Sequence, residues 1–285
     1  MKRYRWLLGC CLFLSIGMLW AADEPDLRML QQKAAQSRDM EGYVGVCKYL
    51  YQTEENPELL LLYADSIHQL ATKSKKPEQL VEYYIWASEG NFIKGDFQQG
   101  YALKRKAIAL AEKAGLKFAI SQSCCDMGYY CNVDARYDSA RYYFRKGLEA
   151  GEDLSEAGEA CRTMLTNYAS SFLFEGKTDS ALVYTIRASE RSAADKDTAM
   201  LIENLNQLGT IYRRKKNLED CIANFEEALH LCELCGNYNT VAFIYGNIAT
   251  AYCDWDRPED AISFSEKALK YALKTDNKRR KENAE

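Results

Sequence analysis

One spacing of small residues, repeated along the chain, constrains the fold more than any other feature of this sequence. Gly209, Cys221 and Ala228 are separated by 12 and 7 residues, and the same two spacings recur at steps of 40 or 41 residues. The other members of the series are Ala249, Ala261 and Ala268; Ala169, Ala181 and Ala188; Gly128, Ala140 and Gly147; and Ser88, Gly100 and Ala107. Two helix backbones approach closely only where the side chains between them are small. A fixed period of such positions therefore predicts stacked pairs of helices.

The residues between these small positions follow the same period. Large apolar side chains recur beside them, and in two successive copies these are Leu208, Tyr212 and Phe225, and then Ile248, Tyr252 and Phe264. Short polar turns separate the helices of each pair, at Gly95-Asp96, Ala135-Arg136, Gly176-Lys177, Lys216-Asn217 and Asp256-Arg257-Pro258. Acidic residues follow several of these turns, where they suit the positive end of the next helix. The pattern predicts a helix–turn–helix unit repeated along the chain.

At these residues the chain resembles a known family. Leu208-Gly209-x-x-Tyr212, followed by Cys221, Phe225 and Ala228, is similar to the tetratricopeptide repeat (TPR), a helix–turn–helix unit of 34 residues. The resemblance implies an all-α fold, a right-handed α-solenoid of TPR-like repeats. It covers five repeats over residues 81–275, preceded by degenerate helical repeats over residues 23–80. The period of about 40 residues marks a long-repeat variety, which resembles exported TPR proteins and the sensor regions of Bacteroidetes regulators.

The first 22 residues have the composition of a targeting segment. A basic stretch, MKRYR, precedes an apolar run from Trp6 to Trp20, which Ala21 and Ala22 follow. This order is typical of a signal peptide, but cleavage after either alanine places Leu19 or Trp20 where a small residue is preferred. The segment is therefore a signal peptide or an uncleaved anchor. Either one predicts an exported protein, periplasmic or membrane-anchored and facing the periplasm.

The charge distribution excludes one class of partner. The formal net charge is −4, and the only basic cluster is Lys278-Arg279-Arg280-Lys281, inside the charged segment 276–285. An acidic chain without a basic face predicts no nucleic-acid binding. Residues 276–285 have the composition of a charged tail or of the start of a truncated helix. In the latter case the last repeat exposes apolar surface, so we also expect self-association through the C-terminal face.

No pattern in the sequence indicates an enzyme or a cofactor. It contains no Gly-rich phosphate loop, no nucleophile elbow and no His-Glu-x-x-His motif. Its two histidines, His68 and His230, lie in different predicted helices. The carboxylates are scattered along faces that the repeat exposes to solvent. We therefore predict neither catalysis nor a metal site nor a cofactor.

The cysteines have three interpretations. Cys232 and Cys235 form a C-x-x-C pair near the end of a predicted second helix, while Cys124, Cys131 and Cys221 occupy core positions of the repeat. Free cysteine packs as a small apolar residue, which is the favoured interpretation. A local disulfide or thiol sensor, and a metal site that lacks enough further ligands, remain the alternatives.

The resemblance also implies a binding surface. In such arrays the first helices line a concave groove, and the residue two before the small position of the first helix points into it. These residues and their neighbours form the predicted peptide-binding groove: Asp126, Tyr129, Asn167, Asn206, Gln207, Thr210, Arg213 and Asn247. Amide side chains carry both a donor and an acceptor, so they can pair with a peptide backbone of any sequence. The same polar residues also suit an ordinary solvated face.

These features predict a non-catalytic exported scaffold that binds a peptide or protein segment in its concave groove. The alternative is the extracytoplasmic sensor portion of a membrane signalling or transcriptional regulator whose output domain is absent from this chain. In both cases the predicted partner is a protein or peptide, and contact with a membrane is predicted only through the N-terminal segment if it stays uncleaved.

Overall fold

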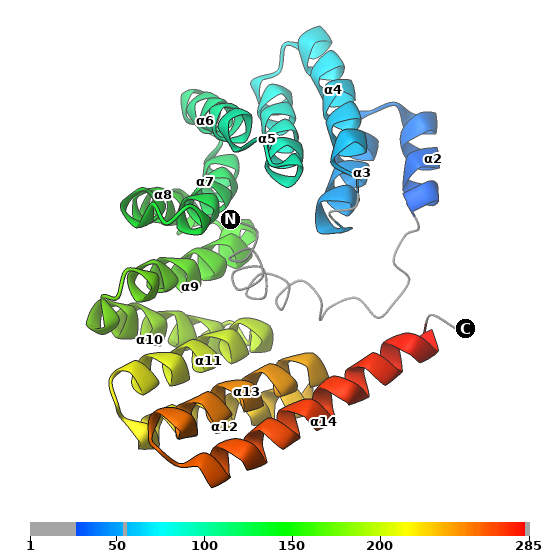
Figure 1. The fold of residues 1–285 in the computed structure, drawn as a ribbon. Coiled ribbons are helices and arrows are strands. Elements are labelled where there is room, and N and C mark those ends of the chain that lie inside the picture. Colours follow the sequence, from blue (N-terminus) through cyan, green and yellow to red (C-terminus); the bar gives the residue numbers. More distant parts are fainter. Residues whose placement is uncertain (1–26, 54–55, 283–285) are drawn as a thin grey trace. The chain divides into compact units, whose positions relative to one another are not determined.

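The structure is a computed structural model that describes residues 27–53 and 56–282, and within these ranges it contains helices and no strands. The signal peptide or anchor predicted for residues 1–22 lies outside them. The α-helices are α2 (Leu27–Ser37), α3 (Met40–Thr53), α4 (Pro57–Ser74), α5 (Pro77–Lys94), α6 (Phe97–Ala114), α7 (Lys117–Val133), α8 (Tyr137–Gly151), α9 (Gly158–Phe174), α10 (Thr178–Ala194), α11 (Thr198–Arg214), α12 (Leu218–Leu234), α13 (Tyr238–Asp254) and α14 (Pro258–Glu282). One 3₁₀ turn, Ser155–Ala157, precedes α9. Successive helices are joined by short turns (Figure 1).

The chain divides into two compact units. The N-terminal unit runs through Cys131 and includes Asp138–Met164, and the C-terminal unit comprises Asn132–Tyr137 and the residues from Leu165 onward. Each unit has its own buried core.

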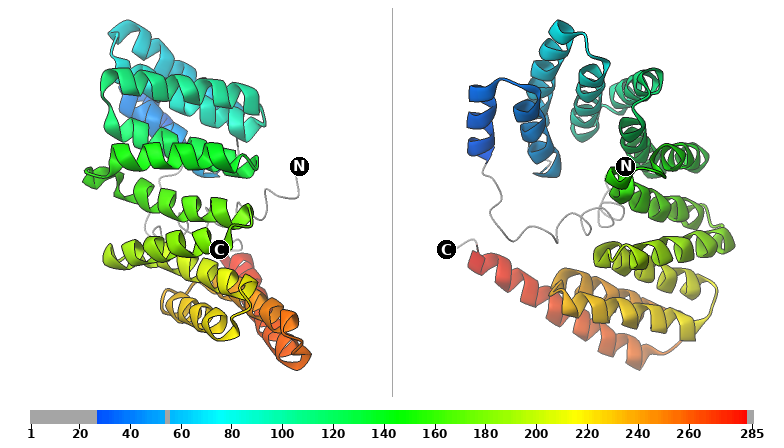
Figure 2. Two further views of the ribbon diagram at one scale, coloured as in Figure 1. Left: turned by 90° about the vertical axis from the view of Figure 1, so that its left-hand side faces the viewer. Right: turned by 180° about the vertical axis from the view of Figure 1, so that it is seen from behind.

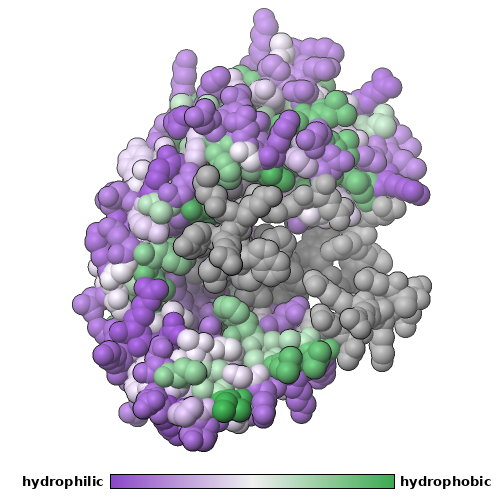
Figure 3. Space-filling model, in the orientation of Figure 1, coloured by the Kyte–Doolittle hydropathy of each residue, from purple (hydrophilic) through white to green (hydrophobic). Residues whose placement is uncertain are grey.

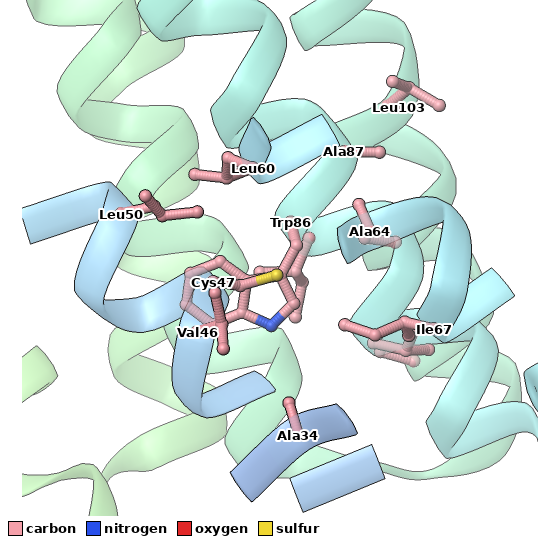
Figure 4. Packing of buried hydrophobic residues seen from close by; sticks show 14 residues of the cluster. Ala34, Val46, Cys47, Leu50, Leu60, Ala64, Ile67, Trp86, Ala87 and Leu103 are labelled. Carbon is pink, nitrogen blue, oxygen red and sulfur yellow. The ribbon is translucent and has the colours of Figure 1, made fainter. Parts of the chain in front are cut away.

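The core of the N-terminal unit lies between helices α2 to α6. Trp86 of α5 is buried at the centre of this cluster, together with Cys47 and Leu60 (Figure 4). The ring of Tyr51 meets the Trp86 ring edge-on, with centroids 6.3 Å apart. The α5 helix is buried over much of its surface because it has neighbours on both sides.

The core of the C-terminal unit lies between α11, α12 and α13, with side chains of α10 and α14 packed against it. Phe225 of α12 and Ile248 of α13 are fully buried in it, and Tyr252 and Phe264 stack with centroids 5.3 Å apart. The two further views in Figure 2 show α12, α13 and α14 lying side by side. The last helix, α14, continues without a break to Glu282, so most of the charged segment 276–285 belongs to it.

The turns inside the five helix pairs share one geometry. Each places a residue with positive φ just after the first helix, and these residues are Gly95, Ala135, Gly176, Lys216 and Asp256. Such a left-handed residue turns the backbone so that following N–H groups bond back to the helix. Asn217 N–H, for example, donates to the carbonyl of Tyr212, while the Asn217 side chain accepts from Asp220 N–H and begins α12.

The small residues of the 40-residue series are buried except for Ala268, which lies half-exposed on the last helix. Gly209 and Gly128 explain why large residues are excluded. A Cβ atom at Gly209 would lie 2.6 Å from the ring of Phe225, and one at Gly128 would lie 2.4 Å from the ring of Phe144. In these two repeats, the small residue of the first helix is thus the place where an aromatic ring of the second helix packs on its backbone.

Within residues 27–53 and 56–282, none of the helices combines the length and the apolarity needed to cross a membrane.

Candidate functional site

The first helices of the C-terminal unit, α9, α11 and α13, carry a row of amide side chains. The Asn247 amide nitrogen on α13 donates to the Asn206 side-chain oxygen on α11 over 2.8 Å. Both side chains are half-buried. This bond leaves the Asn206 amide nitrogen and the Asn247 side-chain oxygen without a hydrogen-bond partner among the described residues. The pair therefore presents one donor and one acceptor side by side, which is what the backbone of a bound peptide requires. We refer to Asn167, Asn206 and Asn247 as the amide row.

Asn167 is the member of the amide row that lies on α9. Its backbone carbonyl accepts a hydrogen bond of 3.0 Å from the Asn132 side chain, and its own side chain is half-buried. Within the described part of the chain, that side chain makes no hydrogen bond, so its amide is available to a ligand.

Gln207 is engaged inside the fold. Its amide nitrogen donates to the Ser170 hydroxyl on α9 over 2.6 Å, and its oxygen accepts from the Thr185 hydroxyl on α10 over 3.1 Å. The side chain therefore joins α11 to the preceding helix pair. A buried hydrogen bond beside it also joins α11 to α9, because the Thr166 hydroxyl donates to the Asn204 side-chain oxygen over 2.9 Å.

The remaining predicted residues of this unit also have partners. The Thr210 hydroxyl donates to the carbonyl of Asn206 over 3.1 Å. Arg213 lies 3.6 Å from the carboxylate of Asp254, and it remains partly exposed. The structure therefore places Asn206, Thr210 and Arg213 along one side of α11, with a cation at its C-terminal end.

Glu203 lies one turn before Asn206 on α11, and the sequence pattern gave no reason to select it. Burial raises the pKa of this carboxyl to about 8, with a smaller contribution from Asp197. Because its side chain is half-buried rather than fully enclosed, some contact with water persists. At neutral pH a carboxyl with this pKa is largely protonated and can donate a hydrogen bond.

Glu203 makes the stability of the C-terminal unit depend on pH. Its pKa is higher in the folded chain than in the unfolded chain, so its contribution is complete below about pH 4.5 and is lost as the pH rises to about 8. We expect Glu203→Gln to increase the free energy of unfolding at pH 9 by about 1–2 kcal/mol, after allowance for residual hydration. Urea denaturation at pH 5 and pH 9 measures this, and an equal change at both pH values would contradict it.

Asp126 and Tyr129 of α7 lie in the N-terminal unit, beside a buried ionic cluster. The Lys104 ammonium is fully buried, and it donates to the Asp126 carboxylate over 2.9 Å and to Glu89. The Tyr130 hydroxyl donates to the other Glu89 oxygen over 2.7 Å. Tyr129 packs edge-on against Tyr130, with ring centroids 5.4 Å apart. Asp126 therefore serves first as a partner of Lys104, and its carboxylate is 30% exposed.

The charges of this cluster depend on one another. Burial alone would lower the pKa of Lys104, but the two carboxylates raise it above its usual value. Burial raises the pKa of Glu89, and the ammonium only partly opposes this effect. Burial, and then the nearby Glu89 carboxylate, raise the pKa of Tyr130. Lys104 is thus held as a cation between two acids, and it is the group that permits Glu89 to be buried.

One sequence feature indicates this cluster, although the pattern of small residues alone does not. Phe144 and Phe225 lie 16 residues after the small positions Gly128 and Gly209. In the repeat that begins with Ser88, the residue at the same distance is Lys104. A lysine in the position of a fully buried aromatic ring requires an acidic partner.

Most cysteines of the described residues are buried, as a packing role predicts, but Cys235 and Cys253 are exposed. Cys124, Cys131 and Cys221 are buried, and Cys232 is fully buried in α12. Burial raises the pKa of Cys232 to about 12, which disfavours the thiolate. Cys235 lies at the end of α12 and is exposed. The two cysteines of the C-x-x-C pair thus occupy different environments. Among the described residues, no three His, Cys, Asp or Glu side chains are grouped to hold a metal ion.

Comparisons with known proteins agree with this architecture. Residues 199–274 match the family model of the tetratricopeptide repeat. A search of curated protein sequences finds no relative of this chain.

Solved structures share the fold at low sequence identity. BtubC from P. vanneervenii is 15% identical, with a TM-score of 0.65, over 81% of this chain and 92% of its own. The apo form of the quorum sensor NprR from B. thuringiensis is 16% identical, with a TM-score of 0.60, over 95% of this chain and 77% of its own. A Rap protein complexed with Competence and Sporulation Factor is 11% identical, with a TM-score of 0.56, over 95% of this chain and 75% of its own. The predicted all-α class is confirmed, and the fold of this protein is a TPR-type helical-repeat solenoid.

Proposed function

We propose that this protein is a non-catalytic scaffold that binds a peptide or protein segment on the first-helix surface of its C-terminal unit. The observation that carries the proposal is the amide row, in which Asn206 and Asn247 bond to each other and each keeps one polar group unused. An extended segment that crosses α11 and α13 would find an acceptor and a donor there. Such pairing uses the peptide backbone, so it fits ligands of varied sequence.

Two neighbouring groups support a particular kind of ligand. Arg213 supplies a partly exposed cation near the amide row, and Glu203 supplies a carboxyl that is largely protonated at neutral pH. Neither group repels an acidic side chain. We therefore infer a preference for segments with an acidic or neutral residue near the C-terminal end of α11.

The comparisons are consistent with a binding role. The quorum sensor NprR and the Rap protein complexed with Competence and Sporulation Factor share the fold of this chain at 16% and 11% identity. Helical-repeat arrays generally act by presenting an extended surface to a partner.

The test selects peptides from a phage-displayed library of random peptides, using the full chain as bait. The selected peptides are then measured against wild type, Asn206→Ala/Asn247→Ala and the control Asn224→Ala. Asn224 lies on the second helix α12 and bonds only within that helix in the described structure. We expect the double variant to weaken binding about tenfold, because two hydrogen bonds of roughly 0.5–1.5 kcal/mol each are lost. Thermal unfolding should change little. Failure to enrich any peptide, or equal affinity for all three proteins, would refute the proposal.

Export is a further part of the proposal, supported by the basic and apolar composition of residues 1–22. We propose that the protein resides in the periplasm, free or anchored to the membrane. N-terminal sequencing of protein from a periplasmic fraction distinguishes a cleaved signal from an anchor, and recovery from the cytoplasm alone would contradict export.

The second candidate function is that of a sensor within a signalling or transcriptional regulator. The likeness to the quorum sensor NprR favours it. In that case a ligand bound at the amide row would be the signal, so the same peptide selection serves both candidates. Sequencing the coding region in its genomic context separates them, because only the sensor requires an output domain in the same reading frame.

A further inference from the structure

The last helix, α14, exposes a stripe of large apolar side chains. Ile262, Leu269 and Leu273 are 60%, 60% and 54% exposed. Residues that are 7 and 11 positions apart lie on one side of a helix, so the three form a single stripe. Hydrophobic residues gather along α14 in the lower right part of Figure 3.

Two of the three corresponding residues of the preceding repeat are covered, and the third, Glu233, is polar and exposed. Forty positions earlier on α12, Ile222 is half-buried and Leu229 is 7% exposed, and both pack in a core to which α13 contributes. No helix among the described residues covers the equivalent side of α14. The α14 stripe is therefore built like a helix–helix packing surface.

The charges along α14 indicate what can cover it. Residues 258–266 contain Glu259, Asp260 and Glu266 and no lysine or arginine, whereas residues 267–274 contain three lysines and no acid. Glu266 and Lys270 are exposed and lie along the same edge of the stripe, because they are one helical turn apart. A second α14 in antiparallel orientation places Glu266 of each copy opposite Lys270 of the other. A parallel arrangement would bring like charges together.

We propose that α14 is a self-association surface, through which two copies of this chain pair antiparallel about a two-fold axis near residue 268. The occupant of the stripe is then Leu269 and its neighbours from the second copy. A self-complementary patch of this kind is what two-fold symmetry requires, because the same residues contribute from both sides. The inference is independent of the proposed peptide binding, which uses the first helices.

Sedimentation velocity of the full chain tests the proposal over a range of concentrations. Leu269→Glu should weaken the dimer at least about 100-fold, because each copy then buries a charge in the apolar contact. The matched control is Val183→Glu, at a side chain 50% exposed on α10, and it should leave the dimer intact. Both variants retain residues 1–22, so association through that segment affects them equally.

Charge reversal separates dimer contacts from effects on the helix itself, whose macrodipole also favours acids early and bases late. Glu266→Lys alone and Lys270→Glu alone should each weaken the dimer about tenfold, because symmetry creates the like-charge contact twice. The double swap Glu266→Lys/Lys270→Glu should restore it. A monomeric wild type, no rescue by the double swap, or an equal loss in Val183→Glu would each overturn the proposal.

Discussion

Replacing Lys104 with methionine should destabilise the N-terminal unit by about 3–5 kcal/mol, the range expected when one partner of a buried ion pair is removed. The Lys104 ammonium is fully buried and bonds to Glu89 and Asp126. Methionine fills a similar volume but leaves Glu89, whose side chain is 3% exposed, without its cation. Urea denaturation followed by circular dichroism measures the loss.

The Lys104→Met effect should depend on pH. Without the ammonium, the pKa of Glu89 rises further above its unfolded value, so the protonated acid favours the folded chain. The stability of the variant should therefore be greatest below about pH 4.5 and should fall as the pH rises, which is the sign expected of a raised pKa. The double variant Lys104→Met/Glu89→Gln removes both charges, and it should recover most of the loss at neutral pH. If Lys104→Met lost less than about 1 kcal/mol of stability, the ion pair between Lys104 and Glu89 would contribute little.

Alanine at Gly209 should destabilise the C-terminal unit by about 2 kcal/mol, because overpacking a filled core costs 1–3 kcal/mol. The added Cβ would lie 2.6 Å from the Phe225 ring, which is fully buried. Gly246 of α13 is the matched control, because a Cβ there meets nothing within 4 Å. Gly246→Ala should stabilise by about 0.5–1 kcal/mol through helix propensity alone.

The two glycine variants should therefore change the free energy of unfolding in opposite directions. Thermal or urea unfolding of both variants measures this difference. The double variant Gly209→Ala/Phe225→Leu should lose less stability than the sum of the two single variants, because the smaller side chain leaves space for the methyl group. Stabilisation by Gly209→Ala would contradict the close approach of α11 and α12.

Some features of the candidate site followed from spacing and others did not. Asn167 and Asn247 lie two residues before the small positions Ala169 and Ala249, where the repeat predicts groove residues, and Asn206 was predicted only as a neighbour of such a position. The same rule also selected Gln207, which the structure shows bonded to Ser170 and Thr185 inside the fold. Spacing identifies the side of a helix, but it does not tell whether a neighbouring helix already satisfies a polar group.

The sequence by itself determined the class of fold and the place of the five turns inside the helix pairs. Small residues at a fixed period, polar turns and apolar rings between them are local requirements of helix pairing, so they appear directly in the order of residues. Only the tertiary structure decided that Lys104 is buried between Glu89 and Asp126, that Asn206 meets Asn247, and that the α14 stripe lies open. These outcomes depend on side chains from different helices, 15 to 41 residues apart for the bonded pairs. Their contacts are set by the distance and orientation of neighbouring backbones, which no local pattern specifies.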